Sequence, residues 1–193
     1  LAIGVAATLV WGMLSLGTQA QLAEKEVRLH VIANSDTEAD QALKLQVRDR
    51  VADRAEAVLR GAADRQDAMD ALAAALPELE ELAAEEISAE GYDYAVTAAL
   101  EKTNFPTKTY DGFALPAGEY MALRVVIGAG EGRNWWCVVF PPLCTAAAAD
   151  VPQTAMAAGL DAEDVALIRE DGAGYTLKFK SIELWEALRE RFS

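Results

Sequence analysis

Alternating apolar and polar residues predict strands at several places along the chain. Residues 27–34 read VRLHVIAN, in which every second position is Val, Leu, Val or Ala. The same period of two occurs in residues 92–100 (YDYAVTAAL) and 120–127 (YMALRVVI), as expected for strands with one buried face. Residues 135–140 (WWCVVF) are apolar throughout, which is typical of a central strand covered on both faces.

The segments between these strands carry turn signals. Residues 128–134 (GAGEGRN) lie between two predicted strands. We therefore interpret them as a hairpin loop and not as a phosphate-binding loop, which needs a following helix. Residues 105–110 (FPTKTY) are expected to be extended, and Pro106 places them near a sheet edge or bulge.

Three helices are predicted between the first two strands. Ser35, with Glu three positions later, forms a capping-box pattern. The helix that it starts has one apolar stripe: Leu43, Val47, Val51, Ala55, Val58 and Leu59. Gly61 is expected to end this helix. A second helix is predicted over residues 66–76. Pro77 suits the first turn of a third helix, and Gly91 is expected to be the C-terminal cap of that third helix.

The region after residue 144 has weaker patterns. Residues 145–173 are Ala-rich at first and are expected to be partly irregular. Residues 165–169 and 175–179 flank the turn signal EDGAG, which favours a hairpin. Ser181 is expected to cap a final helix. The inward side chains of that helix are predicted to be Leu184, Trp185, Leu188 and Phe192.

These elements, in this order, predict an α+β fold. We expect a mixed, largely antiparallel sheet with helices packed on it. No repeat and no linker interrupts residues 21–193, so they are expected to form a single domain. An N-terminal signal or anchor helix is predicted to precede it.

That N-terminal helix is predicted from residues 1–20, which contain no charged side chain. An apolar helix of this length spans roughly 30 Å, about the thickness of a bilayer core. It ends in Thr18-Gln19-Ala20, a small-residue pattern typical of a cleavage site. A signal peptide that is removed and a membrane anchor that is retained both stay open. Either one places residues 21–193 outside the cytoplasm.

The charge of the chain excludes some classes of partner. There are 31 acidic and 17 basic residues, which give a formal net charge of −14. Nucleic-acid-binding proteins need clustered Lys and Arg to neutralise phosphates, and this sequence has no such cluster. An anionic membrane surface would repel the domain. We therefore expect neither partner, and we interpret the acidity as serving solubility.

Cys137 and Cys144 are the two cysteines of the chain. A close pair in an exported protein favours a disulfide, and Pro141-Pro142 between them can turn the chain back; two buried free thiols are the alternative. His30 is the single histidine and cannot form a zinc site with cysteines spaced in this way. Paired with Cys137 it would make an envelope hydrolase, although its pattern favours a half-exposed strand residue.

Two further groups of residues are candidates for binding. Asn34, Ser35 and Asp36 have oxygens that could hold a cation at a strand end, but a helix cap explains the same residues without an ion, and we favour the cap. Trp135 and Trp136 point to opposite faces of their strand, as core residues or as a hot spot for a protein partner. The sequence contains no GxSxG, HExxH, CxxC or P-loop motif. We expect no cofactor, no metal site and no enzymatic activity.

Several runs together resemble one protein family. They are RLHVIANSD at residues 28–36, QALKLQVRD at 41–49, FPTKTY at 105–110, PAGEYMALRVVIG at 116–128 and GRNWWCVVFPPLC at 132–144. In this order they resemble the stage II sporulation protein R family over residues 27–144. The last run is long and unusual, which makes the resemblance specific.

The resemblance implies a secreted signal of endospore formation that acts in the space between forespore and mother cell. Its implied partner is a membrane-embedded aspartic protease, which cleaves the precursor of the mother-cell factor sigma-E and supplies the catalysis. Membrane contact is expected only through residues 1–20, if they are retained. We predict a partner surface that comprises Asn34, Asp36, Asn134, Trp135, Trp136, Pro141 and Pro142.

Overall fold

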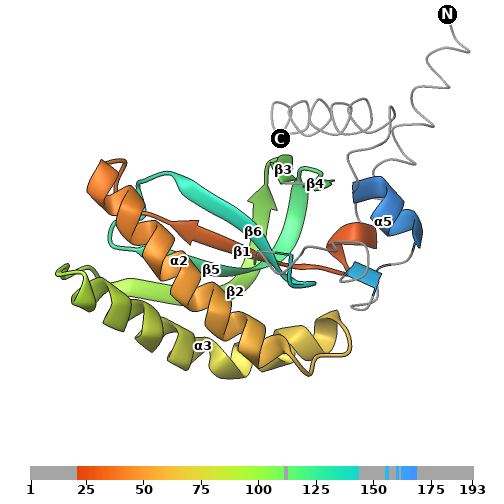
Figure 1. The fold of residues 1–193 in the computed structure, drawn as a ribbon, viewed down its shortest axis with the longest axis horizontal. Coiled ribbons are helices and arrows are strands. Elements are labelled where there is room, and N and C mark those ends of the chain that lie inside the picture. The colour runs from red at the N-terminus through yellow and green to blue at the C-terminus, as the bar shows by residue number, and fades with distance from the viewer. Residues whose placement is uncertain (1–20, 111–112, 144–154, 157–159, 161, 169–193) are drawn as a thin grey trace, which may run out of the picture.

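The computed structural model describes residues 21–110, 113–143, 155–156, 160 and 162–168 of the 193-residue chain. Its centre is a four-stranded sheet with the strand order β2-β5-β1-β6, and two long helices cover one face (Figure 1). The helices are α2 (Glu38–Leu59), α3 (Arg65–Ala89) and the short α5 (Ala162–Ile168). The strands are β1 (Val27–Ile32), β2 (Val96–Phe105), β3 (Lys108–Tyr110), β4 (Phe113–Leu115), β5 (Gly118–Ile127) and β6 (Asn134–Phe140). The predicted α+β class is confirmed.

β1 organises the topology of the sheet. It pairs in parallel with β5 and antiparallel with β6, so that His30 lies between Arg124 and Trp136. β2 completes the sheet by pairing antiparallel with β5. The prediction that the strand from Val27 and the strand from Trp135 share one sheet, with the first long helix packed across it, is confirmed (Figure 1).

The predicted hairpin at residues 128–134 is wrong. β5 and β6 lie on opposite sides of β1, so the chain between them crosses the end of β1. The prediction of β6 as a central strand is also wrong, because β6 is an end strand of the described sheet. Its side chains are nevertheless buried on both faces: Cys137 and Val139 pack toward the helices. Val138 packs in a second cluster with Leu115.

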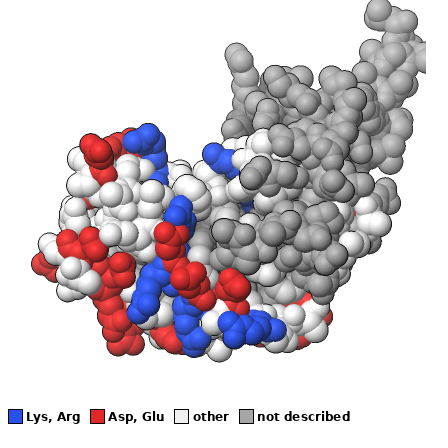
Figure 2. All heavy atoms as spheres, in the orientation of Figure 1, with Lys and Arg blue, Asp and Glu red and all other residues white. Residues whose placement is uncertain are grey.

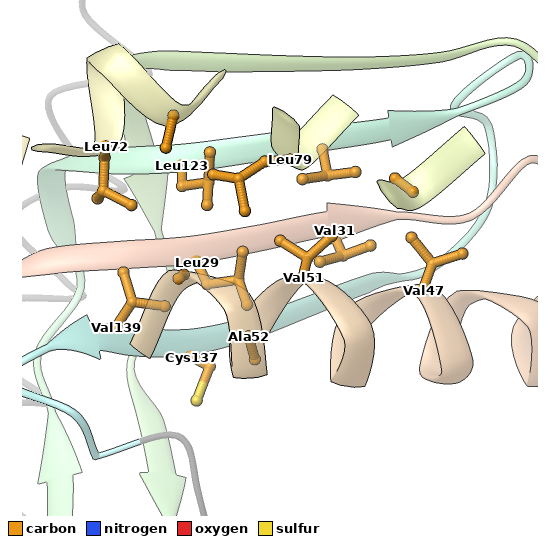
Figure 3. Packing of buried hydrophobic residues seen from close by; sticks show 14 of the residues in the cluster. Leu29, Val31, Val47, Val51, Ala52, Leu72, Leu79, Leu123, Cys137 and Val139 are labelled. Atoms are coloured by element: carbon orange, nitrogen blue, oxygen red, sulfur yellow. The ribbon is translucent and has the colours of Figure 1, made fainter. Parts of the chain in front are cut away.

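The main core lies between the sheet and the two long helices. Figure 3 shows Leu29 and Val31 of β1 facing Val47 and Val51 of α2. The rest of the predicted stripe of α2 also faces this core, with Leu43, Ala55 and Leu59 buried and Val58 half-buried. Full burial of one valine or leucine side chain contributes about 1.5–3 kcal/mol. The apolar stripe therefore stabilises the packing of α2 on the sheet.

The ends of α2 show one wrong and one confirmed prediction. The N-cap residue is Thr37, whose Oγ1 accepts a hydrogen bond from the Asp40 N–H at 3.2 Å. Ser35 is not the cap, because its hydroxyl donates to the Asp40 carboxylate instead. The helix ends at Leu59, shortly before Gly61, as predicted.

The second and third predicted helices form one continuous helix, α3, with Pro77 inside it. Proline removes the hydrogen bond to the carbonyl four residues earlier. Pro77 and Ala73 are both exposed, so water can bind that carbonyl and the helix continues. It ends at Ala89, and Gly91 terminates it as predicted, with φ at +83° and its N–H donating to the Ser88 carbonyl.

The other strands differ from the prediction in two ways. β2 begins at Val96, later than predicted. β3 does not extend the main sheet but forms a separate two-stranded sheet with β4. A second cluster joins these short strands to Leu22 and to α5. Residues 165–168 belong to α5, so the strand predicted at residues 165–169 is wrong in this part.

The other C-terminal predictions and the N-terminal one lie outside the described residues. These are the strand at 175–179, the helix from Ser181 and the signal or anchor helix at residues 1–20. Within the described part of the chain, no helix is long and apolar enough to cross a bilayer.

Candidate functional site

Residues 128–134, which cross the end of β1, are hydrogen-bonded to residues 34–36. We call these two segments together the strand-end junction. The Asn34 side-chain oxygen accepts a hydrogen bond from the Ala129 N–H at 2.9 Å, and the Asn34 backbone carbonyl accepts one from Glu131 at 3.2 Å. The Asp36 carboxylate accepts one from the Arg133 N–H at 2.7 Å. The two segments are thus joined by hydrogen bonds along most of the loop.

Glycines let the loop lie directly on the turn. A Cβ at Gly128, where φ is +58°, would lie 2.2 Å from the Asn34 side-chain oxygen. A Cβ at Gly132 would lie 2.2 Å from the Ser35 carbonyl oxygen. A Cβ atom does not come this close to an atom to which it is not bonded, so glycine permits the close approach.

Asp40, at the start of α2, is hydrogen-bonded to two residues of the junction. Its carboxylate accepts hydrogen bonds from Ser35 at 2.5 Å and Asn34 at 2.9 Å, and these bonds hold the pKa of Asp40 below its usual value. Lys44 donates to the Arg133 carbonyl at 3.0 Å. The polar groups of this turn therefore bind the loop and the helix, which favours the structural explanation over a cation site.

The two tryptophans lie on opposite faces of β6, as adjacent strand residues do. Trp135 is half-buried against the main core, and the Arg48 guanidinium lies 4.1 Å from its ring centroid. Trp136 is half-buried on the other face, where its ring stacks on His30 with centroids 3.9 Å apart. Each ring thus has one shielded side, and neither is a fully buried core residue.

His30 is a structural residue on the face of the sheet that lies away from α2 and α3. It is 5% exposed, and its Nε2 lies 2.9 Å from the Asn134 side-chain oxygen. Burial lowers the pKa of His30 below its usual value, and the hydrogen bond to Asn134 only partly opposes this. The side chain is more buried than the half-exposed position that we predicted.

The structure does not bring Cys137 and His30 together. Leu29 is the β1 partner of Cys137, and His30 is the partner of Trp136, so the thiol and imidazole positions face opposite sides of the sheet. Cys137 also belongs to a disulfide. The pair therefore cannot act as nucleophile and base. Cys144 lies outside the described residues, and its pairing with Cys137 stays a prediction.

The remaining predicted contact residues lie at both ends of β6. Asp36 and Asn134 are exposed at the strand-end junction. Pro141, which follows a cis peptide bond, is buried, and Pro142 is half-buried. The two prolines thus lie at the other end of β6 from Asn134, and the predicted surface is not one continuous patch.

Sequence reasoning missed a buried charged cluster beneath β3. The fully buried Arg28 guanidinium donates to the Cys137 carbonyl and to the Tyr110 hydroxyl, both at 3.0 Å, and lies 4.4 Å from the Phe105 ring centroid. An oxygen of the equally buried Glu26 lies 3.7 Å from Arg28. Burial raises the pKa of Glu26 to about 7, against the opposing effect of Arg28. The alternation over residues 27–34 predicted a single buried face, formed by the apolar positions, and gave no sign that Arg28 is buried as well.

Comparison with known proteins supports the family resemblance of residues 27–144. The family model described as Stage II sporulation protein R matches residues 23–150. Stage II sporulation protein R of Bacillus subtilis (strain 168) is 37% identical over 123 residues, which cover 64% of this chain and 55% of that protein. The chain thus matches little more than half the length of this relative. No solved structure matches it. Because the family match covers more than half of the chain, this protein belongs to the stage II sporulation protein R family.

Proposed function

We propose that this protein is an exported signal of endospore formation that activates a membrane-bound aspartic protease. The activated protease then cleaves the precursor of sigma-E. Membership of the stage II sporulation protein R family supports a role in sporulation. The finer role, as a binding domain that switches on an enzyme in another membrane protein, is our inference.

The observation that carries this proposal is the strand-end junction. The backbone N–H groups of its loop donate hydrogen bonds to Ala33, Asn34 and Asp36, and Lys44 donates one to a carbonyl of the loop. The side chains of Glu131, Arg133 and Asn134 are exposed. A surface that is already ordered loses little conformational entropy when a partner binds. This is the property expected of a domain whose function is to dock.

The arrangement of reactive groups supports placing the catalysis in the partner. His30 and Cys137 face opposite sides of the sheet, and Cys137 is in a disulfide. Within the described ranges, no three His, Cys, Asp or Glu side chains gather as metal ligands would. A binding role uses the ordered surface and needs none of these groups.

We infer that the protein acts outside the cytoplasm, in the space between forespore and mother cell. The uncharged residues 1–20 support export as a signal peptide or an anchor. A disulfide at Cys137 also fits an oxidising compartment.

The test is a co-expression experiment in a host that does not sporulate. The membrane protease and a tagged sigma-E precursor are expressed with or without the full chain carrying residues 1–20. Precursor cleavage, followed by immunoblot, is expected only when the chain is present. Gln46→Ala on the exposed side of α2 serves as a control that should retain full activity. Equal cleavage without the chain would show that the protein is not the trigger.

A further inference from the structure

β2 forms one end of the described sheet, and most backbone groups on its outer side have no partner among the described residues. The Ala95 carbonyl accepts a hydrogen bond from Gly128 at 2.7 Å, so odd-numbered residues of this segment turn their peptide groups toward β5. The Ala98 N–H points the other way and donates to the Glu80 carboxylate of α3 at 2.9 Å. Because the direction alternates along an antiparallel strand, Leu100, Lys102 and Asn104 also present their N–H and C=O groups outward.

Three features leave this edge open to another strand. β2 is paired with β5 over ten consecutive residues without a shift of register, so no bulge twists the edge away. No proline lies within the strand, since Pro106 follows its last residue. Within the described part of the chain, only the outward N–H of Ala98 has a hydrogen-bond acceptor, which is the Glu80 side chain. Edges of this kind pair readily with an extended segment.

The surroundings of the edge determine which segment fits. Val96 and Leu100 of β2 and Leu76 of α3 pack on the main core but stay half-exposed, and they offer apolar contacts beside the edge. Glu80 is the carboxylate at the edge itself. Figure 2 shows acidic side chains gathered over the C-terminal half of α3, at the left of the view. Glu81 and Glu85 in this half of the helix and Glu90 directly after it are exposed.

We propose that the outer edge of β2 is a docking site for an extended, basic segment of the protease, which adds to the sheet as a fifth strand. The choice of partner rests on the proposed function. Main-chain hydrogen bonds to Leu100, Lys102 and Asn104 supply the affinity, as in other cases of strand addition. Apolar side chains of the segment contact Leu76 and Leu100, and a Lys or Arg pairs with the Glu80 carboxylate.

A proline at Lys102 tests the main-chain hydrogen bonds. The substitution Lys102→Pro removes an outward N–H and leaves the bonds to β5 in place, since proline is tolerated on the free side of an edge strand. The matched control, Lys102→Ala, removes the side chain and its surface ion pair with Glu119 but keeps the N–H. Each full-length chain is tested for co-purification with the detergent-solubilised protease and for precursor cleavage, and its thermal unfolding is recorded.

We expect Lys102→Pro to raise the concentration of protein needed for half-maximal cleavage by about tenfold, as expected for the loss of one hydrogen bond. Lys102→Ala is expected to stay within about twofold of the wild type, because exposed ion pairs contribute little. Glu80→Lys tests the basic character of the segment without changing the backbone of β2. Glu80→Lys should weaken co-purification about tenfold. Glu80→Gln should weaken it less, because the glutamine amide oxygen can still accept the hydrogen bond from the Ala98 N–H.

The outcomes separate the two proposals. If the wild type triggers cleavage and both Lys102→Pro and Glu80→Lys act like it, the edge is not the docking site and the proposed function stands. If the wild type triggers no cleavage, both proposals are overturned. Sedimentation velocity identifies a different occupant: a wild-type dimer that becomes monomeric on Lys102→Pro would mean that a second copy takes the edge, which also overturns this proposal.

Discussion

Replacing Asn34 by alanine is expected to loosen the strand-end junction without disturbing the main core. The side chain makes two hydrogen bonds that alanine cannot make. Its oxygen accepts from the Ala129 N–H at 2.9 Å, and its amide nitrogen donates to the Asp40 carboxylate at 2.9 Å. Asn34 is half-buried, so water can replace part of what is lost.

The size of the effect follows from these two bonds. A hydrogen bond between neutral groups contributes about 0.5–1.5 kcal/mol, and one to a charged group about 1.5–3 kcal/mol. Allowing for replacement by water, we expect the free energy of unfolding to fall by about 2 kcal/mol. For a domain of this size that loss corresponds to a melting temperature lower by about 4–8 °C.

The loss is also expected to depend on pH. Hydrogen bonds from Ser35 and Asn34 lower the pKa of Asp40 in the folded state below its usual 3.8. A carboxyl group with a lowered pKa contributes stability that is present above its unfolded pKa and is lost as pH falls through the folded value. The difference between the wild type and Asn34→Ala should therefore be full at pH 7 and should shrink below pH 3.8.

Urea unfolding at pH 7 and at acidic pH measures both effects. Gln46→Ala, at an exposed position of α2, is the control and should leave the stability unchanged. If Asn34→Ala changes the free energy of unfolding by less than about 0.5 kcal/mol, Asn34 is not what holds the loop. An equal loss at both pH values would show that the negative charge of Asp40 does not strengthen its bond to Asn34.

Three further predictions concern other parts of the fold. Gly132→Ala should destabilise the protein by about 1–3 kcal/mol, because its Cβ would lie 2.2 Å from a backbone oxygen, whereas Gly61→Ala should be tolerated, since nothing lies within 4 Å of its Cβ. In the wild type, the pKa of Glu26 is raised from 4.5 to about 7, so stability should fall as pH rises through this range by up to about 3 kcal/mol; urea unfolding of Glu26→Gln should show no such decline. Alkylation of the exported, denatured and unreduced protein should find no free thiol if Cys137 and Cys144 are paired, and two thiols would contradict the pairing.

The sequence predicted the elements that depend on local patterns. The stripe of α2 faces the sheet as its period of 3.6 requires, and Gly91 ends α3 because the position needs a positive φ. The alternation over β1 and β5 identified both strands and the sides that face the main core. These features follow from neighbouring residues alone.

The wrong predictions depend on contacts between distant residues. Nothing in residues 128–134 signals that β1 lies between β5 and β6, because strand order is set by the packing of the whole sheet. Ser35 fits a cap locally, but the carboxylate of Asp40 draws its hydroxyl away. Arg28 is buried because β3 and the residues before β1 cover that face, so its alternation pattern was misleading.

The candidate partner surface was only partly predictable. The spacing placed Trp135 and Trp136 on opposite faces, and the structure confirms this. It gave no sign that Asn34 binds the loop before β6, although the glycines at 128 and 132 indicate a close approach of two backbone segments. The open edge of β2 could not be inferred, because it depends on which strand of the described sheet pairs on one side only.

The central claim, that this domain triggers a protease from outside the cytoplasm, is tested most directly by sided reconstitution. The purified protease is placed in liposomes of known orientation, with the sigma-E precursor on the side of its cytoplasmic face. Residues 21–193 are then added to one side or the other, and cleaved precursor is measured over time. The account predicts cleavage only when the domain is on the extracytoplasmic side of the protease. Cleavage without the domain, or equal cleavage from either side, would contradict it.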